Sequence, residues 1–88
     1  MTWAVSFTKS ARKQLSKLSP ADRNRVLKFL NERVVGHPDP RELANRLQGK
    51  SVELWRFRVG DLRLIVQISG GLMTVVVIEI GHRREIYR

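Results

Sequence analysis

The sequence lacks cysteine, has few acidic residues and contains no long apolar run. Without cysteine, disulfide bonds and thiolate metal ligands are excluded. The longest apolar run, Val75 to Ile78, is far too short to span a bilayer, and the N-terminal residues lack the apolar core of a signal peptide. We therefore expect no membrane attachment and a cytoplasmic location. The two histidines, His37 and His82, lie far apart with no ligand spacing around them, so we also expect no metal site and no cofactor.

Basic residues, in contrast, are abundant. The 88 residues include 17 Lys and Arg against 8 Asp and Glu, which gives a formal net charge of +9 at pH 7. A charge of this size on a small chain predicts nucleic acid or an acidic protein as the partner, and binding that weakens strongly as salt is added. The length fits a single domain over residues 1–88 with one modest hydrophobic core.

The first part of the chain predicts a strand followed by a helical hairpin. Apolar side chains recur on one side of residues 2–7, which is typical of a short strand. Thr8 is suited to cap a helix that reaches Leu18, and Ser19, which precedes a proline, is suited to cap a second helix that Gly36 ends. The buried stripes are expected to consist of Ala11, Leu15 and Leu18 in the first helix and Val26, Phe29, Leu30 and Val34 in the second. We expect this hairpin to lie on the apolar face of a sheet.

The rest of the chain predicts three further strands. Residues 37–40 are expected to form a turn, because a residue that precedes proline is disfavoured in a helix, and a short helical turn with Leu43 and Leu47 on one side follows. Runs rich in β-branched and aromatic residues then cover 53–59, 62–68 and 72–80, separated by turn signals. The fold class is therefore α+β, with an N-terminal strand, a two-helix hairpin and a three-strand antiparallel meander that form one twisted sheet.

The arginines of the first two meander strands are predicted to gather on one face. Strand side chains alternate between faces, and a two-residue loop at 60–61 places Arg58 directly opposite Arg63, with Arg56 on the same face. Like charges directly opposite each other destabilise a sheet by a few tenths of a kcal/mol and up to about 1. Three converging guanidinium groups therefore favour a bound polyanion. The alternative interpretation is a solvated outer face.

Four segments, taken together and in order, resemble the RelE/ParE superfamily of bacterial and archaeal toxins, and most closely its RelE branch. They are Leu43 to Gly49 (LANRLQG), Trp55 to Arg58 (WRFR), Leu62 to Val66 (LRLIV) and Ile80 to Tyr87 (IGHRREIY). The resemblance implies a RelE-like microbial RNase fold and a ribosome-dependent endoribonuclease, or mRNA interferase, that cuts mRNA in the A site of the 30S subunit and so inhibits translation. It also implies a cognate RelB-like antitoxin. We expect the toxin alone to be a monomer and its antitoxin complex to be an oligomer.

The resemblance further implies which residues form the site. In the family, these are basic residues on the second and third strands, an arginine after the last strand and a tyrosine near the C-terminus. The matching positions in this sequence are Arg56, Arg58, Arg63, Arg83 and Tyr87. Arginine stands at both positions where lysine is the commoner family residue, and the gap between the last two positions is shorter than in the best-known member.

The chemistry implied by this resemblance needs no metal, because the 2′-hydroxyl of RNA attacks the adjacent phosphate. Arg58 and Arg63 would stabilise the phosphorane, and Arg83 would stabilise the leaving oxygen electrostatically. Tyr87 would be the base, because neighbouring guanidinium groups lower the pKa of a phenol; its alternative role is to pack the chain end against the sheet. His82 is the rival acid or base, since imidazole changes charge near neutral pH. The remaining arginines expected to bind RNA are Arg56, Arg84 and Arg88.

Two other functions stay open at this point. A ParE-like toxin would bind and inhibit DNA gyrase without cutting nucleic acid. A basic module without catalytic activity would bind only RNA or its antitoxin.

Overall fold

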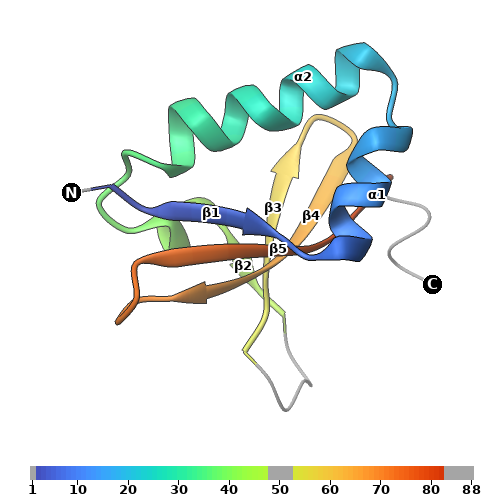
Figure 1. Cartoon of the computed structure of the whole chain (residues 1–88). Helices are drawn as coiled ribbons and strands as arrows, with labels where there is room; N and C mark the ends of the chain where they lie inside the picture. The colour runs from blue at the N-terminus through green and yellow to red at the C-terminus, as the bar shows by residue number, and fades with distance from the viewer. Residues whose placement is uncertain (1, 48–52, 83–88) are drawn as a thin grey trace.

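The computed structural model describes residues 2–47 and 53–82, which form a sheet with two helices on one face (Figure 1). The elements in chain order are β1 (Ala4–Phe7), α1 (Lys9–Lys17), α2 (Pro20–Phe29), η1 (Leu30–Val34), η2 (Pro40–Leu43), β2 (Asn45–Arg46), β3 (Trp55–Val59), β4 (Leu62–Ser69) and β5 (Thr74–His82). The predicted α+β class, with the helical hairpin between the first strand and a three-strand meander, is confirmed.

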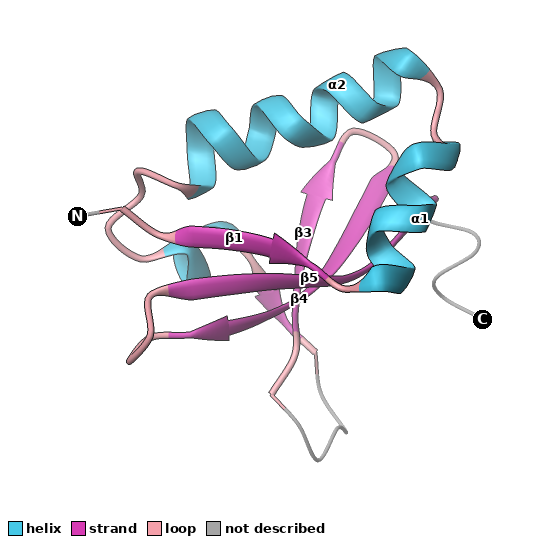
Figure 2. Cartoon of the chain, viewed as in Figure 1, coloured by secondary structure: helices cyan, strands magenta, loops and turns pink. Residues whose placement is uncertain are grey.

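The two helices (Figure 2) begin directly after the predicted caps, Thr8 and Ser19. The Thr8 hydroxyl accepts a hydrogen bond of 3.1 Å from the Ala11 N–H, and the Ser19 hydroxyl accepts one of 3.2 Å from the Asp22 N–H. Each bond satisfies a backbone donor that has no partner within the first turn of a helix. Pro20 at the first helical position needs no such partner because it has no N–H. The helix boundaries follow from these local interactions.

The second helix ends in a turn that is wider than an α-helix. After α2, the five residues of η1 form a π-helical turn, and the Val35 N–H donates to the Leu30 carbonyl over 3.0 Å. A π turn rotates the following side chains relative to an ideal α-helix. Val34 is nevertheless fully buried, so the predicted apolar stripe continues to the end of the helix.

The sheet has five strands in the order β1-β5-β4-β3-β2. β1 runs parallel to β5, and the other neighbours are antiparallel. The β3–β4 hairpin closes with Val59 opposite Leu62 across a two-residue turn. Gly60 occupies the first central position of that turn with φ of 60°, a conformation that glycine adopts without strain and that hairpin turns of type II′ require there.

A β-bulge interrupts the pairing of β4 with β5. Ile65 lies opposite Glu79 and Val66 lies opposite Val77, so Ile78 is an extra residue in β5. Before the bulge Val77 faces the core, and after it Ile80 does. Strict alternation from Val77 would have turned Glu79 inward, so the bulge keeps the carboxylate out of the core and brings the next apolar residue into it.

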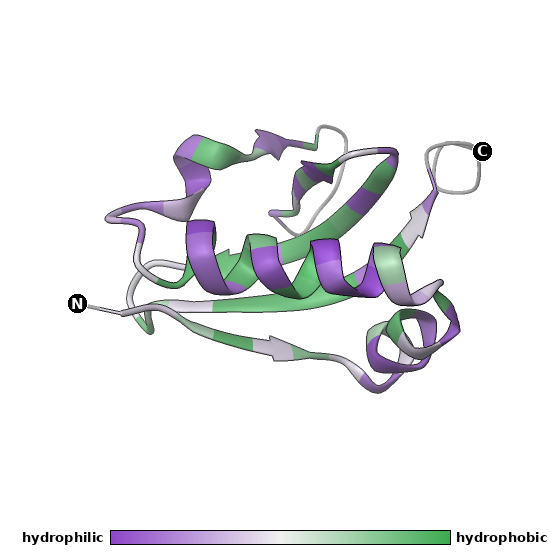
Figure 3. Ribbon diagram, turned by 90° about the horizontal axis from the view of Figure 1, so that it is seen from above, coloured by the Kyte–Doolittle hydropathy of each residue, from purple (hydrophilic) through white to green (hydrophobic). Residues whose placement is uncertain are grey.

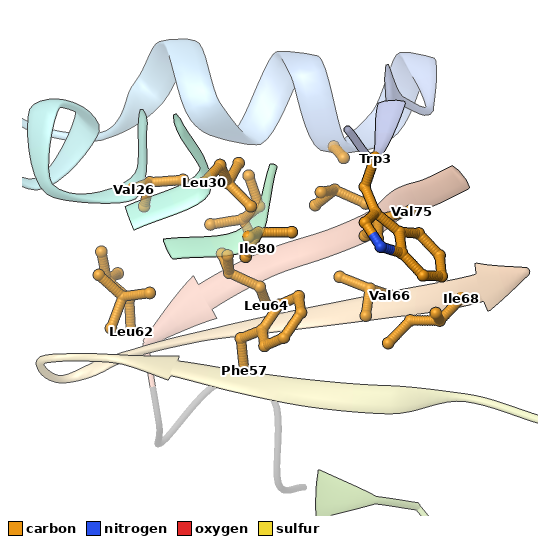
Figure 4. Close-up of a cluster of buried hydrophobic side chains, with 14 residues drawn as sticks. Trp3, Val26, Leu30, Phe57, Leu62, Leu64, Val66, Ile68, Val75 and Ile80 are labelled. Atoms are coloured by element: carbon orange, nitrogen blue, oxygen red, sulfur yellow. The ribbon is translucent and has the colours of Figure 1, made fainter. Parts of the chain in front are cut away.

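The hydrophobic core lies between the helices and the sheet (Figure 4). Seen from above, the strands beneath α2 are predominantly hydrophobic, whereas α2 carries hydrophilic residues between its hydrophobic ones (Figure 3). Phe57 and Leu64 are fully buried at the centre, and the ring of Phe29 meets that of Phe57 edge-on with a centroid distance of 5.3 Å. The helical hairpin therefore lies on the apolar face of the sheet, as predicted.

Several element boundaries differ from the predicted ones. The helical turn after residue 40 is a 3₁₀ turn, η2, and a two-residue strand, β2, follows it and pairs with β3. The last turn extends to Met73, which has φ of 48°, so β5 begins at Thr74 and continues to His82. The sequence predicted a start at residue 72 because apolar residues begin there, but the left-handed conformation of Met73 belongs to the turn.

Candidate nucleic-acid interface

Three arginines lie on the sheet face that points away from the helices. Arg58 of β3 is directly opposite Arg63 of β4, and Arg56 is directly opposite Ile65. The strand residues next to them, among them Phe57, Leu62 and Leu64, are buried in the core. Because strand side chains alternate, the three guanidinium groups share the other face, here called the arginine face. The hairpin brings them together from two neighbouring strands.

The three arginines differ in their exposure. Arg58 is exposed and Arg56 is half-buried. Arg63 is only 5% exposed, and its Nη1 donates to the Leu62 carbonyl over 3.4 Å. A guanidinium stays charged throughout the physiological pH range. The arginine face therefore presents a fixed positive charge whose innermost member is largely removed from water, where its interaction with an anion is screened less by solvent.

The bulge in β5 adds two residues to this face that sequence reasoning missed. Gly81 lies directly opposite Arg63 and is buried, and Glu79 lies opposite Ile65 and is exposed. Glu79 is the one acidic residue in the five strands. It is diagonal to Arg63 across the β4–β5 pair, within reach of a long side chain. Only the bulge, which the sequence pattern did not reveal, places this carboxylate beside the arginines.

A further neighbour comes from the unpredicted edge strand. Asn45 of β2 is directly opposite Arg56, so its amide lies on the arginine face. An amide offers both donors and acceptors, and it is able to hydrogen-bond a nucleotide without adding charge. The sequence did not predict β2 because a strand of two residues is too short to show an alternating pattern of apolar and polar side chains.

Along the C-terminal half of β5, side chains of Thr8 and of α1 bond the strand backbone on the side where β1 pairs with its first half. Pairing with β1 ends at Phe7. Beyond it, the Thr8 hydroxyl donates to the Ile78 carbonyl over 3.1 Å, and the Gln14 Oε1 accepts from the Ile80 N–H over 2.7 Å. These two side chains satisfy backbone groups next to the bulge and thereby fix the segment that carries Glu79 and Gly81.

His82 does not lie on the arginine face. It is directly opposite Leu62, whose side chain faces the core, so the imidazole points to the helical side of the sheet, where it is exposed. The structure thus separates the rival acid or base from the arginines. The other predicted site residues, Arg83, Arg84, Tyr87 and Arg88, lie outside the described residues.

Comparison with known proteins identifies the family. A family model described as the ParE toxin of the type II toxin–antitoxin system parDE matches residues 5–87. The chain belongs to the RelE/ParE superfamily of toxins. The toxin is 34% identical to Toxin RelG of Mycobacterium tuberculosis over 94 residues, which cover 100% of this chain and 99% of that relative. The predicted resemblance is confirmed, and the chain is a RelE-family toxin of a type II toxin–antitoxin system.

Solved structures of related toxins have the same fold. The toxin–antitoxin complex RelBE2 of Mycobacterium tuberculosis matches with a TM-score of 0.79 and 28% identity, covering 94% of this chain and 93% of that one. The archaeal RelE–RelB complex of Pyrococcus horikoshii OT3 matches with a TM-score of 0.70 and 29% identity, covering 94% and 97%. The fold of this toxin is therefore that of proteins solved together with antitoxins.

The loop before β2 contains a close ion pair. Arg41 Nε donates to Asp39 Oδ1 over 2.9 Å, and this hydrogen bond is the main reason why the pKa of Asp39 lies below its ordinary value and that of Arg41 above it. The Arg41 guanidinium also lies over the β4–β5 turn, since a Cβ on Gly70 would be 3.3 Å from its Nη2. The pair connects η2 to that turn.

Two kinds of feature are missing from the part of the toxin that the structure describes. Within residues 2–47 and 53–82, no three His, Asp or Glu side chains are grouped so that they could hold a metal ion. No helix in these ranges is both long and apolar enough to cross a membrane.

Proposed function

We propose that this toxin is a ribosome-dependent endoribonuclease that cuts mRNA in the A site of the 30S subunit, in the cytoplasm. The observation that supports the proposal best is the cross-strand pair of Arg58 and Arg63, with Arg56 on the same face. Two guanidinium groups held opposite each other repel, and a phosphate between them converts that repulsion into attraction. Charge-assisted bonds from planar guanidinium groups suit a phosphorane, which carries an extra negative charge.

In the proposed reaction, the 2′-oxygen attacks the adjacent phosphorus and the bond to the 5′-oxygen breaks. The products are a 2′,3′-cyclic phosphate and a free 5′-hydroxyl. Tyr87 accepts the proton of the 2′-hydroxyl, and a water molecule returns a proton to the 5′-oxygen, whose developing charge Arg83 stabilises. Arg58 and Arg63 stabilise the phosphorane, while Arg56, Arg84 and Arg88 hold the flanking RNA.

We further propose that a RelB-like antitoxin encoded with the toxin inhibits it by covering the arginine face with acidic side chains. Complexes with antitoxins are among the solved relatives. The net charge of +9 favours an acidic partner. Carboxylates paired with Arg58 and Arg63 would remove the same repulsion that a phosphate removes, so the antitoxin and the message would compete for one surface.

One finding favours a second candidate. The family model that matches this chain carries the description of the ParE toxin. This match favours the alternative that the protein inhibits DNA gyrase by binding it. Such a protein does not need guanidinium groups converging on a scissile bond, so the two functions differ in how much they depend on Arg58 and Arg63.

Primer extension on an mRNA that is being translated by purified ribosomes tests the proposal. We expect cuts within codons for the wild type, no cuts when ribosomes are omitted, and no cuts for Arg63→Ala or Arg83→Ala. Arg46→Ala is the matched control, because Arg46 lies at the sheet edge opposite Trp55 and faces away from the arginine face. It should cut like the wild type.

Equal cutting by Arg63→Ala and the wild type would contradict the assignment of the site. Intact message together with inhibition of gyrase supercoiling by the pure protein would instead establish the ParE-like function. Intact message without gyrase inhibition would leave only binding to RNA or antitoxin.

A further inference from the structure

The side chains of the arginine face form rows that run across the strands. Residues directly opposite one another on β3, β4 and β5 make up one row, here called the phosphate row, which consists of Arg58, Arg63 and Gly81. Gly81 has no side chain, so the two guanidinium groups are the only side-chain groups of this row. In the proposed reaction the phosphate row holds the scissile phosphate.

A second row lies two residues further along each strand, about 7 Å from the phosphate row. It is here called the acid row and consists of Asn45, Arg56, Ile65 and Glu79, on β2 to β5. Ile65, which is 7% exposed, lies between Arg56 and Glu79, and these two residues are therefore two strands, or roughly 10 Å, apart. The acid row thus keeps its cation and its carboxylate on separate strands.

The carboxylate of Glu79 is available to a ligand. Glu79 is exposed, and it forms no hydrogen bond or ion pair with the residues that the structure describes. Its diagonal neighbour Arg63 is buried and directs Nη1 to the Leu62 carbonyl. The sheet therefore carries one acid on a face of three arginines and leaves that acid exposed to solvent.

The backbone on both sides of Glu79 is fixed. The Ile78 carbonyl accepts a hydrogen bond of 3.1 Å from the Thr8 hydroxyl, and the Ile80 N–H donates one of 2.7 Å to Gln14 Oε1. A group on a fixed backbone loses less conformational freedom when it binds a ligand than a group on a mobile loop does. The position of Glu79 is therefore suited to selective recognition.

A carboxylate on this face repels every phosphate of an RNA chain, so it favours only a ligand group that offers hydrogen-bond donors. Guanine presents two adjacent donors on its Watson–Crick edge, N1–H and the N2 amino group, which match the two carboxylate oxygens as a bidentate pair. Adenine and cytosine place an unprotonated ring nitrogen beside their amino group, and uracil places its single N–H between two carbonyl oxygens. Guanine is therefore the base that satisfies both oxygens without bringing an acceptor against them.

We propose that Glu79 selects the sequence that is cut, by accepting two hydrogen bonds from the Watson–Crick edge of a guanine next to the phosphate held by Arg58 and Arg63. Single-stranded RNA exposes this edge of its bases, and so does an A-site codon that is not paired with a tRNA. The inference rests on the proposed function, because it places the scissile phosphate on the phosphate row. It adds to that function a residue that determines base specificity.

Fluorescence anisotropy with labelled 2′-O-methyl pentanucleotides tests the proposal. The methyl group blocks attack by the 2′-oxygen, so binding is measured without cleavage. The probes are UUGUU, UUIUU and UUUUU, where I is inosine, which keeps N1–H but lacks the N2 amino group. The wild type should bind UUGUU about 10-fold more tightly than UUIUU, because one hydrogen bond to a charged group is lost.

Two charge-matched variants localise the preference. Glu79→Gln places an amide N–H against the guanine donors and should bind UUGUU and UUIUU with affinities within about 2-fold of each other. The same variant should bind UUUUU more tightly than the wild type does, since a repulsion is removed. Glu32→Gln makes the same change of charge at an exposed position of η1, on the helical side of the sheet, and should keep the 10-fold preference. Circular dichroism verifies that both variants are folded.

Equal binding of UUGUU and UUIUU by the wild type would overturn the proposal, as would a preference for UUGUU that survives in Glu79→Gln. Sequencing of the cut sites on translated mRNA gives the second test. Glu79→Gln should still cut, but the enrichment of guanine beside its cut sites should disappear, and an unchanged enrichment would also overturn the proposal. Preferential binding of UUGUU together with uncut message would support the guanine subsite and contradict the proposed nuclease function, so the two claims fail separately.

Discussion

Replacing Arg58 by glutamate should stabilise the toxin while removing its cleavage activity. Arg58 is exposed and directly opposite Arg63, which is only 5% exposed. A glutamate at this position replaces a like-charged cross-strand pair by an oppositely charged one. In the proposed reaction the same change removes a cation from the phosphorane. A residue that serves catalysis at the expense of stability should show both effects together.

The size of the stability gain follows from the pairing. Like charges directly opposite each other cost a few tenths of a kcal/mol and up to about 1, and an opposite-charge pair contributes roughly 0.2–1 kcal/mol. Together these give a gain of about 1 kcal/mol in the free energy of unfolding. For a domain of this size, about 1 kcal/mol corresponds to a rise in Tm of roughly 4–8 °C. Added salt should reduce the rise, because the Debye length falls from ~10 Å at 0.1 M to ~3 Å at 1 M salt.

Thermal unfolding followed by circular dichroism at low and high salt measures this gain. Arg46→Glu is the matched control, because it makes the same charge change on a strand residue whose cross-strand neighbour is the uncharged Trp55. The difference in Tm between the two variants reports the pair itself. A Tm for Arg58→Glu that is no higher than that of Arg46→Glu, or a gain that is unaffected by salt, would refute the reasoning.

Three further predictions concern single residues. Thr8→Ala removes the cap of α1 and a bond to β5 and should cost about 1–2 kcal/mol in urea unfolding, while Thr8→Ser restores most of it. Glu79→Gln removes the one acid of the strands and should tighten RNA binding severalfold at low salt, an effect that fluorescence anisotropy measures and that must fade at high salt. The Arg41 hydrogen bond lowers the pKa of Asp39 below 3.8, so the stability from this pair is present above pH 3.8 and lost as pH falls through the lowered pKa. Acid titration of unfolding should therefore show a smaller loss of stability for Asp39→Asn than for the wild type.

The elements that the sequence predicted correctly are those with local signals. Thr8 and Ser19 cap helices through neighbours three residues ahead. Gly60 closes a hairpin whose register follows from the length of its loop. The opposition of Arg58 and Arg63 needed nothing more than that register, so the centre of the candidate site was predictable from a short stretch of chain.

The features that the sequence did not predict depend on distant parts of the chain. The bulge at Ile78 lies where the pairing of β5 with β1 ends and hydrogen bonds from β5 to the side chains of Thr8 and Gln14 begin. No residue pattern within β5 predicts it. Asn45 joins the sheet only because β3 is there to pair with it. The sequence therefore predicted the position of the three arginines on this face, but it did not predict that Glu79, Gly81 and Asn45 lie beside them.

The rate of mRNA cleavage by the triple variant Arg56→Gln/Arg58→Gln/Arg63→Gln tests the central claim most directly. Glutamine keeps hydrogen-bonding capacity but removes the charge, and circular dichroism verifies that the variant is folded. In reconstituted translation at saturating toxin, the cleavage rate should fall by at least ~10³-fold, because removal of a single oxyanion-stabilising donor already costs about 10²–10³-fold in comparable sites. A cleavage rate within ~10-fold of the wild type would contradict the claim that the arginine face carries the reaction.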